Sequence, residues 1–181
     1  TFDQEPVSVI LDAATTHTRF ALSRASWGFG GVHGGLALAL LTRAMQAQTN
    51  GMALRRVDGQ FRRSLRGEFE MAVQEDHAGT SVRWLSARAH QNGQTCLSAT
   101  AVLATPGRAD ALPVAAMMPH APAPGTCPIL NVPPEVVAFA WRTEIRPVGV
   151  TRPYQGGERA ELLAWLRFTQ DDVPPDEERL V

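Results

Sequence analysis

Residues 27–35 read Trp-Gly-Phe-Gly-Gly-Val-His-Gly-Gly and run directly into Leu-Ala-Leu-Ala-Leu-Leu at residues 36–41. The helix expected after these glycines has almost no polar face, and a helix that is apolar all round must be buried. Its first turn leaves backbone N–H groups without intrahelical acceptors, and glycines do not shield these donors from a ligand oxygen. The stretch therefore predicts a buried helix whose start could act as an oxyanion hole.

Composition sets the class of molecule. The chain has 181 residues, of which 44% are hydrophobic and 19% charged, and its formal net charge is -1. This is ordinary globular composition, without the basic surface that nucleic acids or anionic membranes require. No run approaches the roughly 18 apolar residues of a membrane span, and the N-terminus lacks a signal-peptide layout. We therefore expect a cytoplasmic protein that binds neither nucleic acid nor membrane.

Several chemistries are disfavoured by residue type and spacing. The two cysteines, Cys96 and Cys127, form no C-x-x-C pair, which fits a reducing compartment. The five histidines are scattered without ligand spacing, so no metal site is expected. The chain has no lysine and no Gly-x-Ser-x-Gly motif, which excludes a Schiff-base lysine and disfavours a serine hydrolase of the α/β type.

The pattern changes from helical to alternating after Leu54. Apolar residues recur at every second position in residues 69–73, 85–89 and 97–103, which is typical of half-buried strands. Asn92-Gly93 is a strong hairpin signal, and Gly79 is expected to be the left-handed residue of the preceding turn. With an extended segment at residues 17–24, the sequence predicts a strand, a glycine turn, a central helix and about four antiparallel strands curved around it.

The second half of the chain is organised differently. Residues 105–134 hold most of the prolines and are expected to form a linker. Residues 139–145 and 160–168 read as two further strands, and residues 174–181 as the start of a helix. We therefore expect an N-terminal domain over residues 1–104, the Pro-rich linker, and the beginning of a second unit over residues 135–181.

The motif Gly30-Gly31-Val32-His33-Gly34-Gly35, the helix after it and the antiparallel strands resemble the hotdog-fold thioesterases. The chain looks most like the double-hotdog acyl-CoA thioesterases, in which two such units lie in one chain. The resemblance covers residues 17–104 well and residues 135–181 in part, and it implies an α+β fold with a curved antiparallel sheet wrapped around a central helix. The family's catalytic aspartate lies in the second unit's helix, which would follow Val181. Either the sequence is a fragment or the second unit is degenerate, and the fragment is favoured because a half-sheet would keep an open edge.

The resemblance assigns roles at the helix start. The N–H of Gly34 or Gly35 would polarise a thioester carbonyl, although both glycines could instead serve only close packing of the helix against the sheet. His33 could orient a substrate group, but a structural role around the turn is the favoured alternative. Asp58 is the nearest carboxylate to a strand expected beside the helix, and a solvated strand position explains it better.

Substrate-binding residues are expected on both sides of this start. Arg62 and Arg63, with Arg66 close by, could hold the phosphates of coenzyme A, because guanidinium pairs well with phosphate. Surface solvation is the alternative. Trp27 and Phe29 could line an acyl tunnel, and core packing explains them equally well.

These features predict a thioester hydrolase that cleaves an acyl-CoA to the free acid and coenzyme A. Coenzyme A would enter as part of the substrate, and no other cofactor is expected. The alternative is a non-catalytic acyl-CoA binding or scaffolding protein built on the same fold. A homo-oligomer is expected in either case, because the open edges of hotdog sheets favour pairing.

Overall fold

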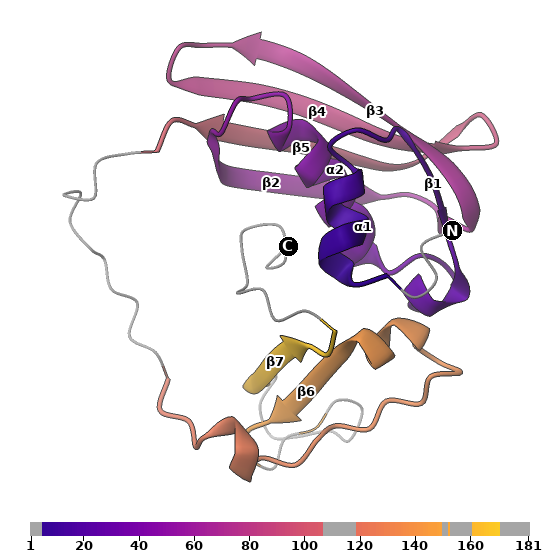
Figure 1. Ribbon diagram of the computed structural model, residues 1–181, viewed down its shortest axis with the longest axis vertical. Coiled ribbons are helices and arrows are strands. Elements are labelled where there is room, and N and C mark those ends of the chain that lie inside the picture. Colours follow the sequence, from indigo (N-terminus) through magenta and orange to yellow (C-terminus); the bar gives the residue numbers. More distant parts are fainter. Residues whose placement is uncertain (1–4, 107–118, 150–151, 153–160, 171–181) are drawn as a thin grey trace.

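The computed structural model describes residues 5–106, 119–149, 152 and 161–170. Its main feature is a five-stranded antiparallel sheet with the strand order β1-β3-β4-β5-β2. Figure 1 shows this sheet curving over the helices, with a two-stranded sheet on the opposite side of them. The described elements, in chain order, are α1 (Val7–Ala13), β1 (Arg19–Leu22), η1 (Arg24–Ser26), α2 (Gly34–Gln46), β2 (Ala53–Phe61), β3 (Gly67–Ala78), β4 (Val82–Gln91), β5 (Gln94–Ala104), η2 (Pro124–Thr126), η3 (Ala138–Arg142), β6 (Thr143–Pro147) and β7 (Ala164–Phe168).

Helix α2 is the centre of the fold. Leu40, Leu41 and Met45 are fully buried against the inner face of the sheet. That face carries small residues on the adjacent interior strands β4 and β5, such as Ala87 and Ala99, and these let the sheet approach the helix closely. The predicted hotdog arrangement of a buried helix wrapped in a curved antiparallel sheet is confirmed.

Left-handed backbone conformations were predicted for two turns between strands, and the structure has one of them. Asn92 and Gly93 both have positive φ, at 50° and 72°, so the predicted hairpin between β4 and β5 is confirmed. The prediction that Gly79 is left-handed is wrong. A Cβ on Gly79 would lie only 2.5 Å from the carbonyl oxygen of Val82, so this position needs glycine for close approach of the backbone.

Helix α1 was not anticipated from the sequence. Its buried residues Val7, Ile10 and Leu11, with Ala14 just after it, follow the spacing of a helix that packs one face on a core. Asp12 on its exposed side pairs with Arg43 of α2 at 3.1 Å. None of the described helices is both long and apolar enough to cross a membrane.

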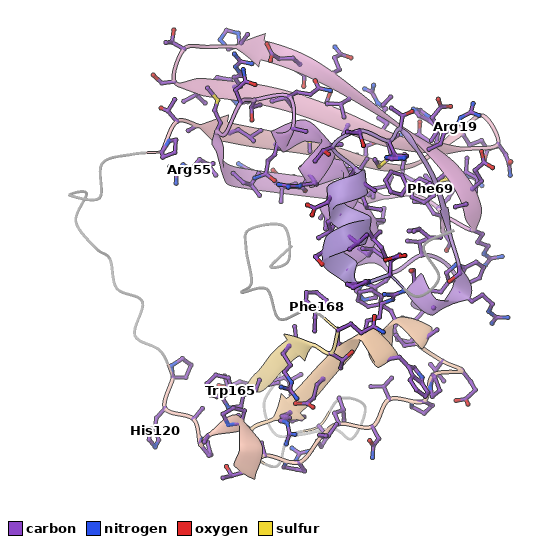
Figure 2. The ribbon with its side chains drawn as sticks, in the orientation of Figure 1. Arg19, Arg55, Phe69, His120, Trp165 and Phe168 are labelled. Carbon is purple, nitrogen blue, oxygen red and sulfur yellow. The ribbon has the colours of Figure 1, made fainter. Side chains whose placement is uncertain are left out.

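The second part of the chain contains a small sheet and contacts the first part mainly through η3, where the N–H of Phe139 bonds to the carbonyl of Trp27. Strands β6 and β7 pair antiparallel, but residues 139–142 form the helical turn η3, so the prediction of one strand over residues 139–145 is only half correct. Phe139 and Arg142, three residues apart in this turn, are both buried. Phe168, labelled in Figure 2, packs against the main core from the end of β7. The helix start expected at residues 174–181 lies outside the described residues.

Candidate functional site

The glycine turn before α2 is fixed by backbone hydrogen bonds. Trp27 and Val32 form an isolated antiparallel bridge, and the N–H of Gly28 donates to the carbonyl of Gly31 at 2.8 Å. Val32 N–H donates to the carbonyl of Leu65 at 2.9 Å, which ties the turn to the connection between β2 and β3. The position of the helix start is therefore set by the sheet as well as by the turn.

The first turn of α2 presents unpaired donors. Ala37 is the first residue whose N–H bonds back along the helix, to the carbonyl of His33 at 3.0 Å. His33 occupies the N-cap position without a capping side-chain hydrogen bond. The N–H groups of Gly34, Gly35 and Leu36 have no acceptor among the described residues. Three backbone donors thus remain unpaired at the positive end of the helix dipole.

A depression of about 340 Å³ lies beside this helix start. Its lining combines apolar side chains from the helix and the sheet with the polar side chains of Arg62, Arg63 and Ser64, so polar and apolar surface are both exposed in it. No carboxylate is found among the described residues that line it. These residues are Val32, Gly34, Ala37, Phe61, Arg62, Arg63, Ser64, Leu65 and Leu97.

Two of the predicted substrate-binding residues lie at this depression. Arg62 and Arg63 are exposed in its lining, directly after β2, and both backbone N–H groups bond to the carbonyl of Cys96, at 2.9 and 3.1 Å. Arg66 is engaged elsewhere, because its Nε donates to the carbonyl of Gly30 at 2.7 Å. The structure therefore brings Gly34, Arg62 and Arg63 together and uses Arg66 to hold the glycine turn.

His33 faces away from the depression. Its ring stacks on Phe139 of η3, with 4.4 Å between ring centroids and 16° between planes. Its Nδ1 is buried and has no hydrogen-bond partner among the described residues. Burial lowers the pKa of His33, so the ring is held neutral. This placement favours a structural role for His33 around the turn over a role in orienting a substrate group.

Trp27 and Phe29 also lie apart from the depression. The guanidinium carbon of Arg24 lies 5.6 Å from the centroid of the Trp27 ring. Trp27 also lines a separate hollow with Glu135 and Val136. Phe29 is 71% exposed on the outside of the turn. Their proposed role as acyl-tunnel walls stays a prediction that this arrangement does not favour.

Asp58 points to the other face of the sheet from α2. Gly59, the next residue on β2, lies against Leu38 of the helix, and Phe61, two positions further on the same face, lies against Gly34, so Asp58 points to the opposite face. There Arg56 donates to both carboxylate oxygens, at 2.6 and 3.1 Å, and these hydrogen bonds hold the pKa of Asp58 below its usual value. Asp58 is a solvated strand residue and cannot activate water at the helix start.

The sequence reasoning missed the apolar residues of the depression, Phe61, Leu65 and Leu97. A signal for Phe61 was present, because it follows Val57 and Gly59 at alternate positions on β2 and so shares their helix-facing side. No comparable pattern pointed to Leu65, which lies in the connection after the strand.

The buried neutral state of His33 gives a pH prediction. Because its folded pKa is lowered, the unfolded chain binds more protons as the pH falls below about 6.5, and the folded state loses stability over that range. In a His33→Gln variant this contribution is absent. We expect the melting temperature of the parent to fall more steeply than that of the variant between about pH 7.5 and about pH 5.5. Parallel curves for the two proteins would show that His33 is not the group responsible.

The curved antiparallel sheet around α2, a helix that begins with two glycines, defines a hotdog domain. Residues 23–104, which contain the turn, α2 and the depression, match the family model of the acyl-CoA thioesterase N-terminal domain. The predicted resemblance to hotdog-fold acyl-CoA thioesterases is therefore confirmed for this part of the chain. No curated protein sequence matches the chain.

Solved structures share the architecture over a longer stretch. A hotdog-fold protein of unknown function from Alicyclobacillus acidocaldarius is 18% identical with a TM-score of 0.78, over 94% of this chain and 66% of that protein. An acyl-CoA thioesterase II from Mycobacterium marinum is 18% identical with a TM-score of 0.65, over 89% of this chain and 58% of that one. At such identities these likenesses establish the fold, and the chain spans less than two thirds of the length of either protein.

Proposed function

We propose that this chain forms part of an acyl-CoA thioesterase, which hydrolyses a thioester to a free acid and coenzyme A. The observation that carries the proposal is the unpaired N–H of Gly34, the first of three at the helix start, in the lining of a depression that also holds Arg62 and Arg63. The match of residues 23–104 to a thioesterase domain supports the same assignment.

The helix start would act on the thioester carbonyl. Its oxygen accepts hydrogen bonds from the first-turn N–H groups, which become stronger as negative charge develops on that oxygen during attack. A water molecule adds to the carbonyl carbon, the carbon–sulfur bond then breaks, and coenzyme A leaves as the thiol once its sulfur is protonated. Arg62 and Arg63 would bind phosphates of the coenzyme A portion.

A carboxylate to activate the water must come from outside the depression. We propose that it belongs to a second hotdog unit, either of the same protein or of a second copy. The edge strand β2 supports this arrangement, since it pairs only with β5 among the described strands and its other edge is open to another sheet.

A non-catalytic acyl-CoA binding protein is the second candidate. The absence of a carboxylate among the described residues that line the depression favours it, because binding requires the apolar lining and the arginines but no water activation. A cytoplasmic location remains a prediction for both candidates.

Two measurements, made on this chain together with the second hotdog unit proposed above, separate the candidates. Release of free thiol is followed with a panel of acyl-CoAs of increasing chain length, and binding is measured by calorimetry with thioether analogues that cannot be hydrolysed. Thiol release above the uncatalysed rate supports the thioesterase. Binding of the analogues without release for any acyl-CoA favours the binding protein, and the absence of both overturns the assignment to acyl-CoA.

A further inference from the structure

The ring of Phe61 lies across the gap between β2 and the start of α2. Phe61 ends β2 and is 59% exposed, although it is one of the large hydrophobic residues of the sheet. A Cβ on Gly34 would lie 3.2 Å from its Cε1, and a Cβ on Gly59 would lie 3.4 Å from its Cε2. The ring therefore rests on two glycines, one on the helix and one on its own strand.

Leu38 fills the space next to Phe61. It lies one turn after Gly34 on α2, and its Cδ1 and Cδ2 atoms lie 3.0 and 3.1 Å from where a Cβ on Gly59 would be. Leu38 itself packs against the main core. The gap between α2 and β2 is thus occupied by Leu38 beyond Phe61, while the depression lies on the other side of the ring, against Gly34 and Ala37.

The chemistry of the depression orients a ligand with respect to this ring. The two arginines favour an anionic group, and the apolar surface exposed in the lining, chiefly that of Val32 and of the Phe61 ring, favours an acyl chain. An acyl chain that enters past the helix start contacts the ring of Phe61, and Leu38 lies next to that ring at Gly59.

We propose that Phe61 is the specificity-determining residue that limits the acyl group, and that the depression takes short-chain acyl-CoAs. The inference rests on the proposed function, because it assumes that acyl-CoA is the ligand. Carbons that lie within the depression are buried, and each buried methylene strengthens binding by about fourfold. Carbons beyond the ring remain in water and add nothing. A plot of affinity against chain length should therefore rise and then become flat, with a break where the chain reaches Phe61.

The test uses thioether analogues of straight-chain acyl-CoAs from acetyl to dodecyl, with dissociation constants measured by calorimetry for four proteins. In Phe61→Ala the break should move to a longer chain, because removing the ring extends the depression toward Gly59. In Phe61→Trp the break should move to a shorter chain. The matched control is Trp84→Ala, which truncates an exposed aromatic residue of β4 on the outer face of the sheet and should leave the break unchanged.

The binding measurements test the role of Phe61 independently of whether the protein hydrolyses acyl-CoA. Opposite shifts in the two Phe61 variants support the proposal even when no thiol is released from any acyl-CoA, in which case only hydrolysis fails. A break at the same chain length in the parent and in both Phe61 variants overturns the proposal, whether or not thiol is released. An equal shift in Trp84→Ala also overturns it, because the effect would then not arise at the ring.

Discussion

A Gly34→Pro variant is expected to lose about a hundredfold or more in kcat for thiol release, which is the usual effect of removing one oxyanion-hole donor. Proline has no backbone N–H, so the change removes the first donor of α2 directly. The loss should fall on kcat more than on KM, because the hydrogen bond strengthens as charge develops on the carbonyl oxygen.

The helix should survive this substitution. Gly34 is the first residue of α2, and proline is favoured at this position because the N–H there has no intrahelical partner in any case. His33, which precedes it, already has ψ of 128°, a value compatible with a following proline. Thermal unfolding of the variant checks that the fold is retained.

Gly34→Ala is the matched control, because it adds a side chain and keeps the N–H. Its Cβ would lie 3.2 Å from Cε1 of Phe61, an exposed ring that can shift by a few tenths of an ångström. We expect this variant to keep kcat within a few-fold of the parent, in contrast to proline. An equal loss in both variants would assign the effect to packing at the ring, and an unchanged kcat in Gly34→Pro would show that Gly34 is not the donor.

The fold could be predicted largely from local patterns. Alternation in residues 69–73 and 85–89 and the Asn92-Gly93 turn specify antiparallel strands, and the unbroken apolar run after Gly35 specifies a buried helix. Both signals depend on residues close together in the sequence. The same local patterns could not foresee that residues 139–142 form a helical turn, since this conformation depends on docking against the distant glycine turn.

The candidate site was less predictable, because contacts between distant segments decide which side chains face the depression. The N–H of Phe139 bonds to the carbonyl of Trp27 at 2.8 Å, and its ring stacks on His33. These contacts turn Trp27 and His33 toward the second part of the chain and leave Phe61 beside Gly34. Nothing in the sequence near residue 27 carries this information, whereas the helix start itself was predictable from its glycines.

The second large effect concerns Gly31, where an added side chain has no room. A Cβ at Gly31 would lie 2.7 Å from the carbonyl oxygen of Leu65 and 2.9 Å from Cβ of Ser64. Both are parts of the connection that holds the turn, and the carbonyl of Leu65 already accepts the N–H of Val32 at 2.9 Å. Gly31→Ala must therefore push this connection away and weaken that hydrogen bond. We expect a loss of about 2–3 kcal/mol in the free energy of unfolding, as is typical of overpacking at a rigid site.

Gly125→Ala provides the control, because a Cβ there meets no atom within 4 Å and should change stability little. Urea unfolding of the parent and the two variants gives the comparison. The position of the helix start depends on the same bond between Val32 and Leu65, so thiol release by Gly31→Ala should fall even at temperatures where the variant is folded. If Gly31→Ala were as stable as Gly125→Ala and released thiol at the parent rate, the turn would tolerate displacement from the sheet. The precise placement of Gly34 would then not depend on this contact.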